Sequence, residues 1–484
     1  MALVFTNEAS TSHLYPCGNP RSRSECSVLA TTMITRGALL WTTVCLAACS
    51  APTISPDAEF STYVESLQAI DNHSHVVTDP ERDRGFDALP CDQTPIAPGM
   101  PPANLRFGPE LQGAWKGLYD FQGSSDAPEQ LAGWQAARAR TRSKAGAGYF
   151  DSVAERVGLD IVLANRISMT PELGARRFRW VSYDDALIFP LNNTHAKAES
   201  PDRQVFYANE ERILETYMTD LGMTRLPASL DEYVAAVVAP TLEAQKNQGA
   251  VAIKFEAAYL RSLDFEPASH DDAEAAYAKY APGGAPAQTE YRQLQDYLFR
   301  RVVAQAGGLG LAVHIHTGGG CGSFFDDRGA DPTLLSSVFN DPALRQTNFV
   351  LLHGGYPFDR HVASLLNKPN VYVDFSALDL LLSSAELARV IRPWLEVMPE
   401  HVLFGTDAGP WAAGMNWEES AWIATRRARR AIVLALSEMA RDGVVTMERA
   451  RVIANGVLRQ NAIDLYKLLR PESSPPARAA GRAP

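Results

Sequence analysis

Short apolar segments alternate along the chain with longer segments of helical periodicity. Eight of the short segments are rich in residues that favour strands and are followed by polar residues: 67–75, 160–164, 178–183, 250–255, 310–316, 348–353, 370–375 and 401–405. The segments between them repeat apolar residues at helical spacing, as in 230–248, 290–307, 331–339 and 385–397. This alternation predicts a parallel sheet covered by helices.

Polar side chains at the ends of these strands decide between two architectures. The residues concerned are His73, His75, His314, His316, His353 and Asp407. In a closed barrel the carboxyl ends of all strands converge on one face, whereas the outer strands of a doubly wound open sheet would hold these groups too far apart. We therefore predict an α/β fold, a (β/α)8 TIM barrel, with residues 76–148 as a long insertion after the first strand and over the active-site face.

The histidines indicate metal chemistry. His73 and His75 are two residues apart, so a strand directs both imidazoles to one side, where they can bind one cation. Five of the chain's ten histidines fall at strand ends, which chance does not explain. Imidazole and carboxylate ligands suit zinc, or else iron or manganese, and leave a position open for water. Asp407 can contact both metal and water, while His353 can exchange a proton with the reacting group.

Six motifs, in order, resemble those of the amidohydrolase superfamily, in its amidohydrolase-related branch of metal-dependent hydrolases and decarboxylases. They are IDNHSH, VAIKFEAAY, HIHTGGG, VLLHGGYPF, VYVDFS and VLFGTDA, and the resemblance spans about residues 70–468. It implies that His73, His75, His316 and Asp407 bind the metal and that His353 is a catalytic acid or base.

Lys254 lies in the second of these motifs, and its role is open. In binuclear relatives a carboxylated lysine bridges two metals and the equivalent of His353 binds the second ion. In mononuclear relatives the lysine is not a ligand. We expect one ion, with two as the alternative, and Lys254 can instead pair with Glu256 or Asp374.

Four further residues are candidate substrate contacts. Arg166 and Arg179 can bind a substrate carboxylate bidentately, although a barrel salt bridge is the alternative for at least one of them. Tyr259 and Arg261 follow Lys254 into a loop and are plausible contacts. We interpret His314 as pocket lining.

The composition of the chain limits the kinds of molecule that it is expected to bind. The formal net charge is -11 and no cluster of lysines and arginines stands out, which argues against nucleic-acid binding. Hydrophobic residues make up 46% of the chain, enough for a large core. We expect a small-molecule substrate.

The N-terminal region predicts export. The segment 33–49 has one arginine, an apolar run too short to span a bilayer, and then small residues before Cys49. It resembles the lipobox of bacterial lipoproteins, which implies a lipid anchor at Cys49, periplasmic or outer-membrane localisation, and Met33 as the true start. The predicted organisation is an extension and signal at 1–48, a tether at 49–58, the barrel at 59–470 and a low-complexity tail at 471–484. Cys91 and Cys321 either form a disulfide or stay free.

These features predict an enzyme. The first hypothesis is hydrolysis of an amide or other C–N bond of a small molecule by metal-activated water. The first alternative is non-oxidative decarboxylation at the same site, which a carboxylate-binding set of arginines would favour. The second is a lipid-anchored binding protein that has lost its activity, which a missing ligand would favour.

Overall fold

Eight parallel strands form a single sheet in the order β1 to β8. The computed structural model describes residues 57–79, 82–83, 85–88 and 103–468. All eight predicted strands are confirmed within a few residues: β1 Ala69–Ser74, β2 Leu159–Asn165, β3 Phe178–Tyr183, β4 Ala250–Phe255, β5 Ala312–His316, β6 Phe349–Leu352, β7 Val371–Asp374 and β8 Val402–Leu403.

The sheet closes between its last and first strands. The amide of Asn72 donates to the carbonyl of Phe404 at 2.9 Å, and further along the amide of His75 donates to the carbonyl of Ala408 at 2.8 Å. Ser74 and Ala408 also form a parallel bridge. Because β8 and the residues after it bond to β1, the sheet is a barrel and the open-sheet alternative is excluded. The prediction of a (β/α)8 barrel is confirmed.

The barrel interior is filled by apolar side chains from nearly every strand. Parallel strands are buried on both faces, which explains why they are continuous apolar runs in the sequence. Residues of the C-terminal helix α17, Asn461–Tyr466, join the same cluster, whose members include Ile70, Leu163, Val181, Ala252, Val350, Leu403, Leu465 and Tyr466. The barrel is therefore a packed core, and polar chemistry is confined to its end.

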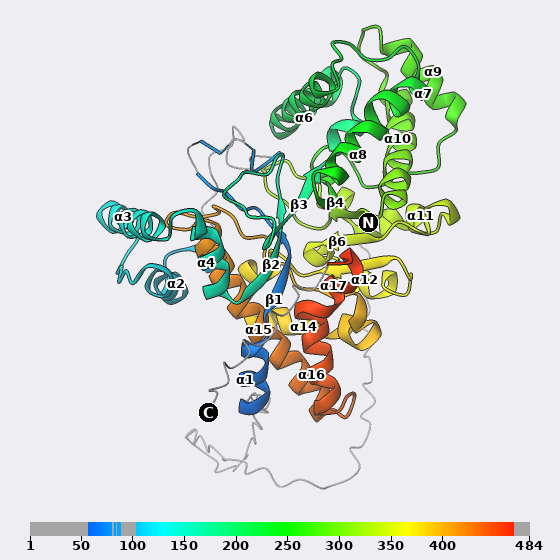
Figure 1. Cartoon of the computed structure of the whole chain (residues 1–484). Coiled ribbons are helices and arrows are strands. Elements are labelled where there is room, and N and C mark those ends of the chain that lie inside the picture. Colours follow the sequence, from blue (N-terminus) through cyan, green and yellow to red (C-terminus); the bar gives the residue numbers. More distant parts are fainter. Residues whose placement is uncertain (1–56, 80–81, 84, 89–102, 469–484) are drawn as a thin grey trace, which may run out of the picture. The chain divides into compact units, whose positions relative to one another are not determined.

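Helices surround the barrel (Figure 1). The predicted helices at 290–307 and 385–397 are α10, Gln288–Gly308, and α14, Ser384–Val397. The predicted helix at 230–248 is α7, Leu230–Tyr233, and α8, Ala239–Asn247, joined by a π-helical segment. The predicted helix at 331–339 is shorter than expected, because a 3-10 turn precedes α11, Ser336–Phe339.

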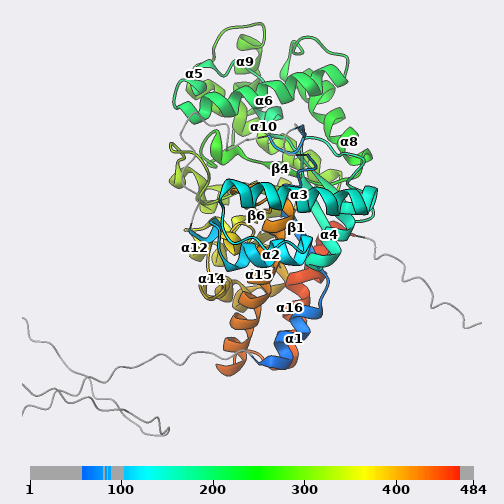
Figure 2. The same ribbon diagram turned by 90° about the vertical axis from the view of Figure 1, so that its left-hand side faces the viewer.

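The described part of the long insertion packs on the outer helices. It contains α2, Pro109–Tyr119, and α3, Pro128–Ala145, which lie beside α4, Tyr149–Val157, and α15, Trp417–Arg441 (Figures 1 and 2). The Trp134 indole donates to Glu419 in the first turn of α15 at 2.7 Å. These two helices therefore brace α15, and Asp87, in the described stretch closer to β1, accepts a hydrogen bond from Tyr183 at the end of β3.

A second group of helices follows β3 and β4. It includes α6, Pro201–Asp220, and α9, His270–Tyr280, which gather with α7, α8 and α10 on the side away from α1, Ala58–Ser66, and α16, Met447–Asn455 (Figures 1 and 2). Helix α6 packs on the turn Asp185–Ile188 that follows β3. The inner face of α6 thus lies close to the carboxyl end of β3.

The predicted signal at 1–48, most of the tether and the tail at 471–484 lie outside the described residues. Among the residues that are described, no helix combines the length and the apolar character needed to cross a membrane.

Asp184, directly after β3, predicts an unusual dependence of stability on pH. Burial raises its pKa to about 6, although hydrogen bonds from Ser182 and Gln245 act in the opposite direction. A raised pKa means that the folded state favours the protonated acid. The contribution of Asp184 to the free energy of unfolding is therefore complete below about pH 4 and is lost as the pH rises through about 6. We expect Asp184→Asn, which mimics the protonated acid, to recover up to ~3 kcal/mol of unfolding free energy near neutral pH.

Thermal melts between about pH 4 and about pH 7 measure this effect. The control is Asp220→Asn, at an exposed position on α6, which should leave the pH dependence unchanged. Identical pH slopes for wild type and Asp184→Asn would contradict the assignment.

Candidate metal centre

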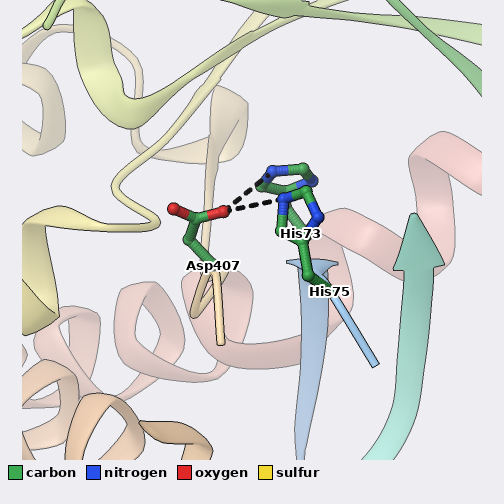
Figure 3. Close-up of side chains that lie close together, drawn as sticks. All are labelled: His73, His75 and Asp407. Carbon is green, nitrogen blue, oxygen red and sulfur yellow. Dashed lines mark ion pairs between the residues drawn. The ribbon is translucent and has the colours of Figure 1, made fainter. Parts of the chain in front are cut away.

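The ends of β1 and β8 bring three candidate ligands together. His73 Nε2 and His75 Nε2 each lie 3.1 Å from the same Asp407 Oδ1 (Figure 3). One potential ligand atom from each residue lies within 4.8 Å of the other two. This spacing is what a small cation shared by the three side chains requires.

The bonding state of His73 also fits a cation. The residue is fully buried, its Nε2 lies 3.1 Å from Asp407 Oδ1, and neither ring nitrogen has a hydrogen-bond partner of good geometry. Buried imidazole nitrogens without partners are costly. A divalent ion between His73, His75 and Asp407 would bind one nitrogen of each histidine and an oxygen of the aspartate. This set of N and O donors suits zinc.

A neighbouring tyrosine fixes the orientation of His75. The Tyr183 hydroxyl, at the end of β3, donates to Asp87 Oδ1 at 3.1 Å and lies 3.1 Å from His75 Nδ1. Because the hydroxyl proton goes to Asp87, the hydroxyl oxygen accepts from Nδ1–H. His75 Nε2, which faces Asp407, is then the nitrogen that keeps a free lone pair. Hydrogen-bond partners fix the tautomer of metal-binding histidines in the same way.

Burial sets the charges of the group. It lowers the pKa of His73 and His316 well below the usual range and that of His353 to about 4. Burial alone would raise the pKa of Asp407, but the adjacent imidazoles of His353, His73 and His75 outweigh it and hold that pKa well below its usual value. Neutral imidazoles and an ionised carboxylate are the states that bind metals.

Asp71 holds β1 and the Asp407 loop together. Its carboxylate accepts from the Thr406 amide at 2.9 Å, the Thr406 hydroxyl at 2.6 Å and the His73 amide at 3.3 Å. The Asp407 amide in turn donates to the His73 carbonyl at 2.8 Å. These bonds keep Asp407 in a left-handed backbone conformation, with φ of 51°, which a non-glycine residue adopts only when its surroundings enforce it.

His353 lies beside this group with one nitrogen free. Its Nδ1 lies 3.2 Å from the Ser376 carbonyl and 3.0 Å from the Ser376 hydroxyl. A carbonyl only accepts, so Nδ1 carries the hydrogen and Nε2 keeps its lone pair. The His353 amide donates to Asp374 Oδ1 at 2.9 Å, and the Ser376 hydroxyl donates to the same oxygen at 2.8 Å. Asp374 therefore positions both His353 and its partner.

His316 is not part of the group of three whose ligand atoms lie within 4.8 Å of one another. Its ring lies 4.7 Å from the ring of His353 and 4.5 Å from that of Tyr259, measured between centroids. Its Nε2 is buried without a hydrogen-bond partner. His316 thus lies beside His353 and Tyr259, and its role as a ligand and the contact of Tyr259 with substrate stay predictions. His314 is deeper, with Nε2 2.7 Å from the Tyr466 hydroxyl in the barrel interior.

Lys254 lies inside the same site. Its ammonium nitrogen is 3.6 Å from Glu256 Oε1 and its side chain is 1% exposed. Its charge contributes to the lowered pKa values of His73, His316 and His353. Of the two partners expected from sequence, Glu256 and Asp374, the structure pairs Lys254 with Glu256, and a bridging role for Lys254 stays a prediction.

The three predicted arginines are used elsewhere. Arg166 bonds Asp83 through two nitrogens, at 2.7 and 3.0 Å, and also bonds the main chain, so it anchors the loop after β1. Arg261 bonds Asp296 at 2.7 Å and Gln295 at 3.0 Å and faces a separate cavity of about 260 Å³. Arg179 is at the amino end of β3, on the opposite barrel face, so its predicted contact with substrate is wrong.

Cys321, in the loop after β5, is disulfide-bonded. Cys91, its predicted partner, lies outside the described residues.

Several residues of the site were not singled out from sequence. Asp71, Tyr183 and Ser376 lie near the histidines because their strands end there, but a polar residue at a strand end does not reveal its partner. Asp374 lies in the VYVDFS motif, and the sequence suggests it only as a partner of Lys254. Strand alternation could have placed Asp71 on the same side as His73.

The fold is thus an eight-stranded parallel barrel in which histidines and an aspartate, at the ends of the first and last strands, form a group that could hold a metal ion. Residues 174–468, more than half of the chain, match the family model described as amidohydrolase. The chain belongs to the amidohydrolase family.

Three other proteins resemble this chain, one in sequence and two in structure. Over 249 residues the chain is 26% identical to protein fluG of Emericella nidulans, a match that covers 49% of this chain and 27% of fluG, so the chain spans about a quarter of that protein. A protein described as a metal-dependent hydrolase from Lactobacillus casei matches with a TM-score of 0.52, 18% identity and coverage of 84% of this chain and 97% of that one. Glucuronate isomerase from Caulobacter crescentus matches with a TM-score of 0.54, 14% identity and coverage of 87% and 95%. At these identities the solved structures support the fold alone.

The bonding of His353 predicts that Asp374→Asn weakens the site. The Asp374 carboxylate accepts hydrogen bonds from the His353 amide, the Ser376 amide and hydroxyl, and the Asn72 side chain. The NH2 group of an asparagine at this position would face one of these donors and could not accept its hydrogen bond. We expect kcat/KM or metal affinity to fall ~10–100-fold, as measured by steady-state kinetics and metal titration. Asp184→Asn, another buried aspartate at a strand end, is the matched control and should retain both. Unchanged kinetics and metal affinity in Asp374→Asn would contradict the positioning role.

Proposed function

We propose that this chain is a metal-dependent hydrolase that cleaves an amide or other C–N bond of a small molecule. The observation that carries the proposal is the meeting of His73, His75 and Asp407 around one point, with His353 beside them. His316 would complete the ligand set from the end of β5. Zinc is the metal proposed, with one ion per chain.

The bound ion would supply Lewis-acid chemistry, lowering the pKa of a water and polarising the scissile carbonyl. The chain's own groups handle protons. Asp407, whose side chain is 19% exposed, is the ligand best placed to accept a proton from water. His353, with Nδ1–H held by Ser376, offers its free Nε2 to carry a proton to the leaving nitrogen.

Decarboxylation is less favoured, because the three predicted arginines are not available to bind a substrate carboxylate. Arg166 and Arg261 are committed to Asp83 and Asp296, and Arg179 is on the other face of the barrel. An inactive binding protein is also less favoured, because each ligand predicted from sequence is present with a buried nitrogen or an ionised carboxylate.

Metal content tests the proposal directly. Elemental analysis of the chain purified without chelators should give about one zinc per chain, lost in Asp407→Ala. His353→Gln should keep the ion while hydrolysis of a panel of aryl amides falls ~10²–10⁴-fold. No metal in the wild type would reject the proposal.

The Lys254→Ala variant distinguishes a site that holds one metal ion from a site that holds two. An unchanged ion count keeps the single-metal assignment, with His353 as acid–base. A fall from about two ions to about one would instead make Lys254 a bridge and His353 a ligand.

We also propose that the chain is an exported lipoprotein anchored at Cys49, on the basis of its lipobox-like sequence. Membrane fractionation should find the wild type with membranes and Cys49→Ser in the soluble fraction. Mass spectrometry of the mature N-terminus should identify an acylated Cys49. An unprocessed N-terminus in the mature protein would reject this assignment.

A further inference from the structure

Three buried carboxylates lie behind the ends of β3 and β4, and we call Asp185, Glu210 and Glu256 the acidic wall. Asp185 and Glu256 follow the two strands, and Glu210 is on the buried face of α6. Their exposed fractions are 1%, 1% and 4%. The Glu256 amide donates to Asp185 Oδ2 at 2.7 Å, which ties two members of the wall together.

The wall has more acceptors than its surroundings use. Asp185 Oδ1, both carboxylate oxygens of Glu210, and Glu256 Oε2 are buried without a hydrogen-bond partner among the described residues. Asp185 and Glu256 are the two groups that act most strongly on the charge of Glu210, and together with burial they raise its pKa well above the usual range. A folded chain rarely keeps such groups unless a ligand or a function requires them.

The wall has one basic partner at close range. Lys254 lies 3.6 Å from Glu256 Oε1, and Arg212 also acts on Glu210. Burial raises the pKa of Asp185 to about 7 and that of Glu210 well above its usual range, so the free wall holds protons. A second positive charge placed beside it would favour the ionised carboxylates and satisfy oxygens that now lack partners.

The wall borders the candidate metal centre. Glu256 caps the turn Ala257–Tyr259, and the Tyr259 ring lies 4.5 Å from that of His316 between centroids. Asp407 and Glu256 both act on one neighbour, since after burial both raise the pKa of Tyr259. A molecule whose reacting bond is at Asp407 can thus extend toward Glu256.

We propose that the acidic wall binds a positively charged nitrogen group of the substrate, so that the amide cleaved belongs to a compound carrying a protonated amine or amidine. This inference rests on the proposed hydrolase function and specifies its substrate class. Three carboxylates match such a group because each of its N–H donors can reach a different oxygen.

A small metal ion fits the wall less well than an organic cation. Metal ligands must come within about 2.0–2.6 Å of one ion, so their atoms must converge. Among the described residues, the ligand atoms of His73, His75 and Asp407 converge in this way, and those of the wall do not. An organic cation with several donors can bridge oxygens that are further apart.

The test compares three ligands of one shape and different charge. Benzamidine is a cation at neutral pH, benzamide is neutral and benzoate is an anion, and calorimetry measures their affinity for the metal-loaded full chain. We expect benzamidine to bind the wild type about 10-fold more tightly than benzamide and benzoate. In Glu210→Gln that preference should largely disappear.

Glu211→Gln is the matched control. Glu211 is the next residue on α6, its side chain is 40% exposed and it pairs with Lys197, so this variant should keep the preference for benzamidine. Glu256→Gln is a second wall variant, expected to lose the preference as Glu210→Gln does, should Glu210→Gln fail to fold by its thermal melt.

Three results would overturn the proposal. They are equal or weaker binding of benzamidine by the wild type, a preference for benzamidine that survives both wall variants, and loss of a metal equivalent in Glu210→Gln, which would make the wall a metal site. Binding is measured without turnover, so these results are separate from a failure of the hydrolase proposal, which metal content and aryl-amide hydrolysis test.

Discussion

The candidate site depends on the bonds that close the barrel between β8 and β1. Asp71 accepts three hydrogen bonds from Thr406 and His73, and the Asp407 amide bonds the His73 carbonyl. These bonds place a carboxylate from one end of the chain against two imidazoles from the other. The left-handed backbone of Asp407 is acceptable only because the closed barrel enforces it.

Burial then gives these groups their chemical states. Exclusion of water keeps the imidazoles of His73, His316 and His353 neutral, and the imidazoles around Asp407 keep that carboxylate ionised. Two neighbours, Tyr183 and Ser376, select the nitrogen that stays free on His75 and His353. The partners of the histidines thus matter as much as the histidines.

Charge is divided unequally around the centre. The basic side chains near it are used for structure, as Arg166 with Asp83 shows, while Glu210 and its neighbours keep oxygens without partners. A site with spare acceptors and committed arginines is better suited to a cationic or neutral compound than to an anion. This imbalance is what separates the acidic wall from an ordinary salt-bridge network.

The sequence by itself determined the barrel, because each strand is a local apolar run and polar residues follow the strands in a fixed order. It also identified His73, His75, His353 and Asp407, since strand alternation and strand ends are local properties. Only the tertiary structure decided which side chains are already paired: it removed Arg179 from the site, tied Arg261 to Asp296 and left Glu210 without a partner. Pairing depends on contacts between residues far apart in the chain, and a local pattern carries no information about them.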